Sequence, residues 1–172
     1  GRIARAASTD DPNLRRRLLT FVFVGGGFAG VEAFAETEDM ARAALRYYPE
    51  LSPSDLRFVM VEAATRILPE MGDEMGGYTL EVLRKRGMEI YLSTRLESCI
   101  DGHIVLSDGQ EFEADTLVWT AGVKPNPVIA QSDLPTGPRG HVSSSPTLQV
   151  VDADGTVVAS ARPIGSMKHS AE

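Results

Sequence analysis

Three glycines at a fixed spacing are the residues of this sequence best suited to chemistry. Gly25, Gly27 and Gly30 match the pattern G-x-G-x-x-G. In that pattern the first glycine allows a tight turn, the second lets a pyrophosphate approach the backbone, and the third lets a helix pack closely. The amides around Phe28 and Ala29, at the predicted start of a helix, and the helix dipole would both attract an anion. The spacing therefore predicts a phosphate-binding loop, and a purely structural glycine turn is the alternative.

A carboxylate follows the next buried stretch, where a dinucleotide site needs one. Glu62 comes directly after RFVMV and could accept hydrogen bonds from the adenosine ribose. It lies 32 residues after Gly30, more than the roughly 20 of the usual fingerprint, and the loop PELSPSD accounts for extra length. A carboxylate here would repel a 2′-phosphate and so favours NAD over NADP, although Arg66 nearby would soften that discrimination. The alternative is an acidic residue at a solvated strand end.

Glu32 has two interpretations. A carboxylate close to a helix N-terminus is favoured by the helix dipole whatever its function. Glu32 also lies one turn beyond the predicted phosphate loop, near where a nicotinamide would extend. The residues alone leave both interpretations open.

Buried strands alternate with helices in the elements that must position these residues. Apolar runs with little polar alternation predict strands buried on both faces of a parallel sheet; they lie at 20–24, 57–61, 88–92 and 116–120. Apolar periodicity predicts helices at 28–46 and 74–86. Gly87 is the predicted C-cap of the second helix.

Asp-Gly dipeptides separate short segments between residues 94 and 113, which predicts an antiparallel meander. The sequence KPNP at 124–127 predicts that no helix starts directly after the last strand, and residues 132–147 predict a loop. The fold class is therefore α/β: a Rossmann-like parallel sheet with an inserted antiparallel β-meander, which is an FAD/NAD(P)-binding fold.

Composition excludes several classes of protein. The formal net charge of −7 gives no basic field for nucleic acid. The cluster Arg15, Arg16 and Arg17 is predicted to be a solvated helix face rather than a binding patch. No apolar run approaches the roughly 18–20 residues of a membrane helix, and the N-terminal stretch has no secretory apolar core. A globular domain with no membrane segment is expected.

The single cysteine and the scattered histidines limit redox and metal chemistry. Cys99 cannot form an internal disulfide or a CxxC pair, which favours a reducing compartment and so a cytoplasmic location. His103, His141 and His169 show no ligand spacing and are assigned to turns or surface. We predict no metal site.

The segments GGGFAGVE and TAGVKPNP, with FVMVEAATRILPEM between them, resemble the NADH-binding half of type II NADH dehydrogenases. The resemblance covers about residues 12–150. It implies a flavoenzyme, peripheral on the inner face of the membrane, that oxidises NADH and passes electrons through FAD to a quinone. By position it places Gly25, Gly27 and Gly30 on the pyrophosphate and Glu62 on the ribose. The nicotinamide end is assigned to Thr120, Ala121 and Gly122, and the acidic residue near nicotinamide and flavin, our catalytic candidate, is Glu32.

The sequence also departs from that family pattern. The family binds FAD through a separate domain with its own glycine motif and a later Gly-Asp motif, and neither is present in these 172 residues. We divide the chain into a linker helix (1–18), an NAD(H)-binding domain (19–150) and an atypical tail (151–172). We expect NADH binding, with catalysis incomplete without an FAD domain. The alternatives are a non-catalytic nucleotide-binding or assembly module and a truncated product. Disulfide reductases are disfavoured because Cys99 has no partner cysteine.

Overall fold

The computed structural model describes residues 1–122 and 124–160, and it divides the chain into two units, Gly1–Gly122 and Val123–Glu172. Four strands form a parallel sheet in the first unit, in the order β3-β2-β1-β7. Their bounds are β1 (Thr20–Val24), β2 (Arg57–Val61), β3 (Glu89–Tyr91) and β7 (Thr116–Trp119). Because β1 pairs with β2 on one side and β7 on the other, the apolar run before the glycines lies inside the sheet, as predicted.

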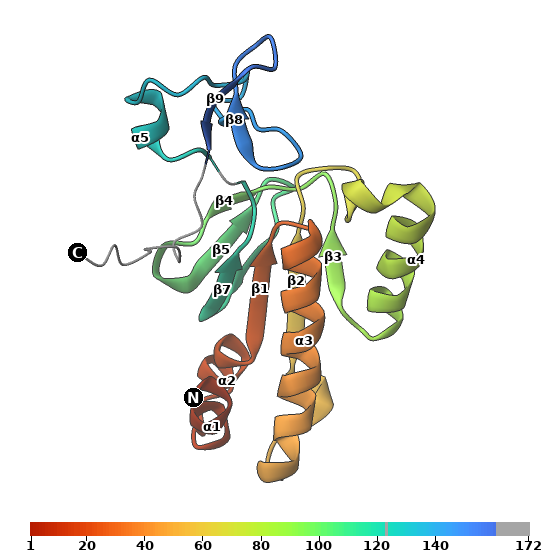
Figure 1. The fold of residues 1–172 in the computed structure, drawn as a ribbon. Coiled ribbons are helices and arrows are strands. Elements are labelled where there is room, and N and C mark those ends of the chain that lie inside the picture. The colour runs from red at the N-terminus through yellow and green to blue at the C-terminus, as the bar shows by residue number, and fades with distance from the viewer. Residues whose placement is uncertain (123, 161–172) are drawn as a thin grey trace, which may run out of the picture. The chain divides into compact units, whose positions relative to one another are not determined.

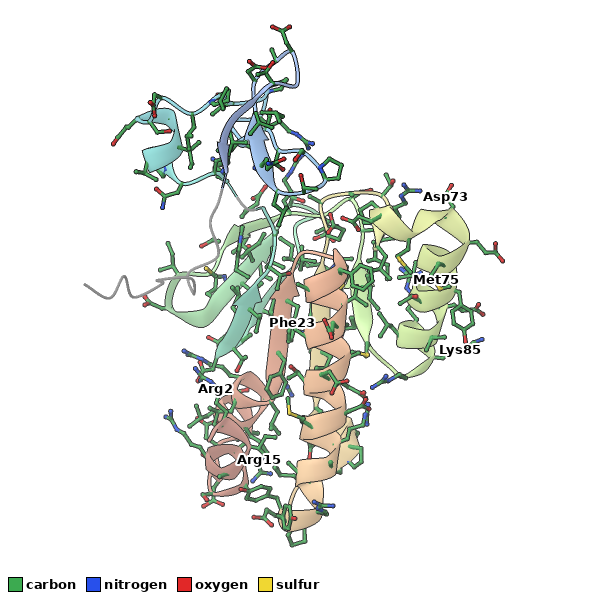
Figure 2. All side chains as sticks on the ribbon, in the orientation of Figure 1. Arg2, Arg15, Phe23, Asp73, Met75 and Lys85 are labelled. Carbon is green, nitrogen blue, oxygen red and sulfur yellow. The ribbon has the colours of Figure 1, made fainter. Side chains whose placement is uncertain are left out.

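Successive residues of β1 and β2 point to opposite faces of the sheet, one covered by helix α3 (Phe28–Ala44) and the other by the meander. Phe21 and Phe58 stack with their ring centroids 5.0 Å apart. Phe23 meets the edge of Phe34 on α3 at 5.2 Å; Figures 1 and 2 show α3 running along the sheet and Phe23 beside it. The intervening valines pack instead against the meander, in a cluster of Val22, Val24, Val59, Val61, Ile104, Leu106 and Ala114. Strand β1 and nearly all of β2 are therefore buried on both faces, which explains their uninterrupted apolar sequence. The prediction of a buried strand is wrong for β7, whose residues are partly buried or exposed because it lies at an edge of the four-stranded sheet.

The predicted meander is a three-stranded antiparallel sheet. Its strands are β4 (Leu96–Ser98), β5 (His103–Leu106) and β6 (Glu111–Glu113), in that order. Both Asp-Gly pairs make turns: Asp101 and Gly102 have φ values of 53° and 82°, and Gly109 has φ 86°. The meander therefore confirms the turn chemistry read from the sequence.

The predicted linker helix over 1–18 is two helices, α1 (Arg2–Ala7) and α2 (Pro12–Leu18). The Asp11 side chain accepts hydrogen bonds from Asn13 N and Leu14 N, which starts a new helix there. The solvated-face prediction for the arginines of α2 is wrong at two positions. Arg15 donates to Ala6 O and Thr9 O, and Arg17 pairs with Asp115. Only Arg16 of the three is exposed.

Helix α4 (Gly72–Lys85) begins two residues before its predicted start, and Gly87 follows it with φ 84°, consistent with a C-terminal cap. Short 3-10 helices occupy Leu45–Tyr47, Pro53–Asp55, Pro69–Met71 and Ile100–Gly102.

A buried carboxylate links α3 to the residue that follows α4. Glu38, only 1% exposed, pairs with Arg42 and with Arg86.

The second unit contains a short helix and a hairpin. Its elements are α5 (Pro127–Ala130), β8 (Gln149–Val151) and β9 (Val157–Ser160). As predicted, no helix starts directly after β7 among the described residues. A short helix starts instead at the end of KPNP, where Pro127 is the first helical residue and the Asn126 side chain accepts a hydrogen bond from Val128 N at 3.0 Å. Proline at this position costs no hydrogen bond. Residues 132–147 form turns with an isolated bridge between Thr136 and Val142. The end of the predicted tail, 161–172, lies outside the described residues.

Candidate functional site

The glycine loop joins β1 to α3 at the carboxyl edge of the sheet. Gly25 has φ 111°, a conformation that favours glycine, and its N–H donates to Val61 O at 2.9 Å. A side chain at Gly25 would place its Cβ 2.8 Å from Ala121 N. At Gly30 the Cβ would lie 2.0 Å from Gly25 O. These two glycines are therefore required for close packing.

Gly27 differs from its neighbours because the space beside it is open. No described atom would lie within 4 Å of a Cβ built there. Gly27 is the N-cap of α3 with extended backbone angles, and its carbonyl accepts the first helical hydrogen bond from Val31 N at 3.0 Å. The amides of Phe28, Ala29 and Gly30 precede that bond and have no acceptor within the helix. Open space above unpaired helix amides suits an anionic phosphate group.

Glu62 is held against this loop. One of its carboxylate oxygens, Oε2, accepts a hydrogen bond from Gly26 N at 2.5 Å, and the other, Oε1, accepts from Ala64 N at 2.7 Å. The side chain is partly exposed, at the end of β2. Each oxygen can accept a further hydrogen bond, so ribose hydroxyls could still bind. The alternative of a merely solvated carboxylate does not describe these contacts.

The segment after β7 packs directly on the glycine loop. Thr120 Oγ1 lies within hydrogen-bond distance of two carbonyls, 3.0 Å from Val24 O and 3.2 Å from Gly25 O. The backbone N–H of Thr120 donates to Val24 O at 2.9 Å. Ala121 is partly buried, and Gly122 is exposed with φ 65°. The structure thus brings Thr120 and Ala121 against Gly25. Gly122 follows them as the last residue of the first unit.

Glu32 is exposed on α3. The first turn of that helix, all of it described, holds no acidic residue, so Glu32 lies beyond the range in which the dipole acts strongly. This weakens the dipole interpretation and leaves the role near the nicotinamide as a prediction. Phe28 is 58% exposed and Ala29 is exposed.

A cavity of about 210 Å³ opens beside the loop on the meander side. Its lining combines the ends of β1 and β2, the segment before β4, and the end of β7: Val24, Gly25, Val61, Glu62, Ala63, Thr94, Arg95, Leu96, Trp119 and Ala121. Sequence reasoning missed Arg95 and Trp119, because their position depends on strand register. It also missed Gly26, where a Cβ would lie 2.7 Å from Ile67 Cγ2; the run of three glycines was the available signal.

Other candidate groups lie outside this site. Arg66 pairs with Asp73 and donates to Pro69 O at 3.3 Å. His103 contacts Glu111 at 3.0 Å on the surface, and His141 is exposed, whereas His169 lies outside the described residues. Among residues 1–122 and 124–160 no group of three metal-ligating side chains forms. In the same residues no helix has both the length and the apolar character needed to cross a bilayer.

Comparison with known proteins identifies the family of the chain. The family model of pyridine nucleotide-disulphide oxidoreductases matches residues 2–157. The type II NADH:quinone oxidoreductase of Haemophilus influenzae is 34% identical over 116 residues, which cover 67% of this chain and 26% of that protein. The Mycobacterium tuberculosis type II NADH:quinone oxidoreductase is 28% identical over 155 residues, covering 85% and 34%. The chain thus spans about a quarter to a third of these relatives.

Solved structures agree on the fold. NDH2 from Plasmodium falciparum, solved in complex with NADH, superposes with a TM-score of 0.73 at 14% identity, covering 87% of this chain and 33% of that one. The NAD-dependent persulfide reductase from A. fulgidus gives a TM-score of 0.57 at 27% identity, covering 77% and 23%. The predicted fold class is confirmed.

Proposed function

The chain belongs to the pyridine nucleotide-disulphide oxidoreductase family, and we propose that it is the NADH-binding part of a flavin-dependent NADH:quinone oxidoreductase. The observation that carries this proposal is the open N-terminus of α3 at Gly27, with Glu62 fixed beside it through Gly26 N. A pyrophosphate would use the amides and the dipole. The adjoining ribose would use the carboxylate.

The residues of the site have separate tasks in this proposal. Gly27, Phe28 and Ala29 would bind the pyrophosphate through backbone amides. Glu62 would accept hydrogen bonds from the adenosine ribose and disfavour a 2′-phosphate. Thr120 holds the end of β7 on the loop through Val24 O and Gly25 O, and with Ala121 and Gly122 it would line the nicotinamide end.

NADH supplies the hydride when it is bound, and the protein supplies binding and orientation. Glu32 would face the nicotinamide end as an acidic side chain. The 172 residues contain one G-x-G-x-x-G loop, and this proposal gives that loop to NADH. We therefore assign no residue to FAD and derive no step through it. The flavin domain, the quinone and a cytoplasmic, membrane-peripheral location belong to the proposal through the relatives.

Titration calorimetry with NADH tests the proposal. Gly27→Val would fill the open space over the helix amides, and its extended backbone accepts a branched side chain, so the fold should persist while NADH binding is lost. Gly77→Val on α4 is the matched control, because Gly77 also has no described atom within 4 Å of a built Cβ. Circular dichroism would verify both folds. Equal NADH affinity in the wild type and Gly27→Val would refute the assignment.

A further inference from the structure

We propose that Gly76 on α4 is a positioning residue for the glycine loop, on which it acts through Ile67 and Leu68. This inference rests on the proposed function, because the loop concerned is the one assigned to the pyrophosphate of NADH. Gly76 is not among the residues that we assign to the ligand. Its task is to fix the shape of the loop.

Gly26 is held at both of its polar backbone groups. It is buried in the middle of the three successive glycines. Its N–H donates to Glu62 Oε2 at 2.5 Å, and its carbonyl accepts from Leu68 N at 2.8 Å. Both partners come from the segment between β2 and α4. That segment therefore orients the peptide groups on either side of Gly26, and the next residue, Gly27, is the N-cap of α3.

Leu68 makes its hydrogen bond from an unusual backbone conformation. Its φ of 49° and ψ of 53° lie in the left-handed region, which bulky residues rarely adopt. The side chain is buried in the core cluster that also contains Ile67. Strained backbone of this kind persists only where the surrounding structure imposes it, and it is concentrated at functional sites. Packing around Leu68 therefore directs its N–H at the loop.

Ile67 lies between two glycines from different elements and is 1% exposed. A Cβ built on Gly26 would lie 2.7 Å from Ile67 Cγ2, and a Cβ built on Gly76 would lie 2.8 Å from Ile67 O. A side chain at position 76 would thus press on the Ile67 carbonyl, while the Ile67 side chain already lies beside Gly26. Close-packed interiors transmit such displacements because they have few voids to absorb them.

The far end of α4 is fixed, which favours movement of Ile67 over movement of the helix. Leu83 is buried in the core cluster, and Arg86, which follows the helix, pairs with Glu38. The residue after the positioning glycine, Gly77, is exposed and has no described atom within 4 Å of a built Cβ. Alanine changes helix propensity equally at the two positions. They therefore form a matched pair that differs in packing.

Amide NMR of the ligand-free 172-residue chain tests the transmission without NADH. We expect Gly76→Ala to shift the backbone amide resonance of Gly26 and to speed its hydrogen exchange, because its bond to Glu62 is loosened. Gly77→Ala should leave both unchanged. A Gly26 resonance that is the same in Gly76→Ala and the wild type would overturn the inference, whether or not NADH binds.

Calorimetric titration with NADH measures the consequence for binding. Gly76→Ala should weaken the affinity about 2- to 30-fold, the range expected for a residue that acts through others. Gly77→Ala should bind like the wild type. Equal affinity in Gly76→Ala and the wild type would reject the positioning role and leave the proposed function intact.

Two substitutions of Ile67 separate positioning from stability. Ile67→Val removes one buried methyl group and keeps both γ carbons, so it should lower the urea midpoint without changing NADH affinity. Ile67→Ala removes the Cγ2 beside Gly26 and should weaken NADH binding as well. Affinity that falls in proportion to stability in both variants would mean that Ile67 has only a structural role, against the inference. Failure of the wild type to bind NADH would instead reject the proposed function and the inference together.

Discussion

The glycines of the phosphate loop have different tasks, although the motif treats them alike. A methyl group at Gly30 would collide with Gly25 O, whereas one at Gly27 would meet no described atom. We expect Gly30→Ala to lower the free energy of unfolding by about 1–3 kcal/mol, because the tightly packed turn must move. Gly27→Ala should cost less than about 1 kcal/mol, since only the helix cap changes. Urea denaturation measures both, and equal losses would contradict the separation of roles.

Glu62 gives a prediction on cofactor selectivity. Glu62→Gln keeps an oxygen that can accept from Gly26 N or Ala64 N but removes the negative charge. The ratio of NADPH to NADH affinity should therefore rise on the order of tenfold, because a like charge near the 2′-phosphate is removed. Glu62→Arg is a poorer test, since it leaves both amides without their acceptor.

The control for the selectivity measurement is Glu97→Gln. Glu97 is exposed on β4, and this substitution makes the same change in net charge. Calorimetric titration of each variant with both cofactors gives the ratios. A ratio that shifts equally in Glu62→Gln and Glu97→Gln would mean that only net charge, and not contact with the ribose, sets the preference.

At the scale of elements, Glu38 links two helices through a buried charge. Burial, the largest influence, raises the pKa of this carboxyl, but the hydrogen bonds and charges of Arg42 and Arg86 together outweigh it, so the pKa is lowered. Because the folded pKa is below the unfolded one, the stabilisation is present above about pH 4.3 and is lost as pH falls through the lower folded value.

Substitution of Glu38 tests this link. We expect Glu38→Gln to lower the free energy of unfolding at pH 7 by about 2–3 kcal/mol. This is less than the loss for a fully buried pair, because both arginines are about a third exposed. The variant should also lose part of the decline in stability that we expect of the wild type below about pH 4.3. Urea denaturation from pH 7 to pH 3 measures this, with the exposed Glu36→Gln on α3 as control. Parallel curves for the wild type and Glu38→Gln would contradict the coupling.

Strands could be predicted from sequence more closely than contacts between side chains. The runs at 20–24 and 57–61 are uniformly apolar because the sheet is covered on both faces, and their bounds are confirmed. The roles of Arg15 and Trp119 could not be predicted. Arg15 donates to Ala6 O on α1 and to Thr9 O between the two helices. Trp119 and Glu62 line one cavity because β1 pairs with β2 on one side and with β7 on the other. Local patterns carry no information on such long-range register.

Within the site, the local glycine motif could be predicted, whereas the long-range contacts around it could not. The spacing of Gly25, Gly27 and Gly30 is local, and the structure places a helix N-terminus where the pattern predicts one. The contact between Glu62 and Gly26 N joins residues 36 positions apart. The sequence predicts that Glu62 follows β2, but the contact with Gly26 N depends on the pairing of β1 with β2.

At the scale of the whole molecule, the 172 residues contain one G-x-G-x-x-G loop. The chain covers 26% of the Haemophilus influenzae relative and 34% of the Mycobacterium tuberculosis relative. A single loop at one helix N-terminus accommodates one pyrophosphate. We therefore expect these 172 residues to bind NADH without oxidising it.

We expect the purified 172-residue chain to bind NADH, to carry no bound FAD and not to oxidise NADH with a quinone. Holding a hydride donor and acceptor in place can supply about 7–11 kcal/mol of barrier lowering, and a chain that binds only the donor lacks this contribution. Added free FAD should consequently give only the background rate. The measurement is the visible absorbance of the folded protein, followed by NADH consumption with a soluble quinone. Gly27→Val serves as the control for binding-dependent turnover. Yellow protein with sustained turnover that Gly27→Val abolishes would show that these residues complete a flavin site and form an active enzyme.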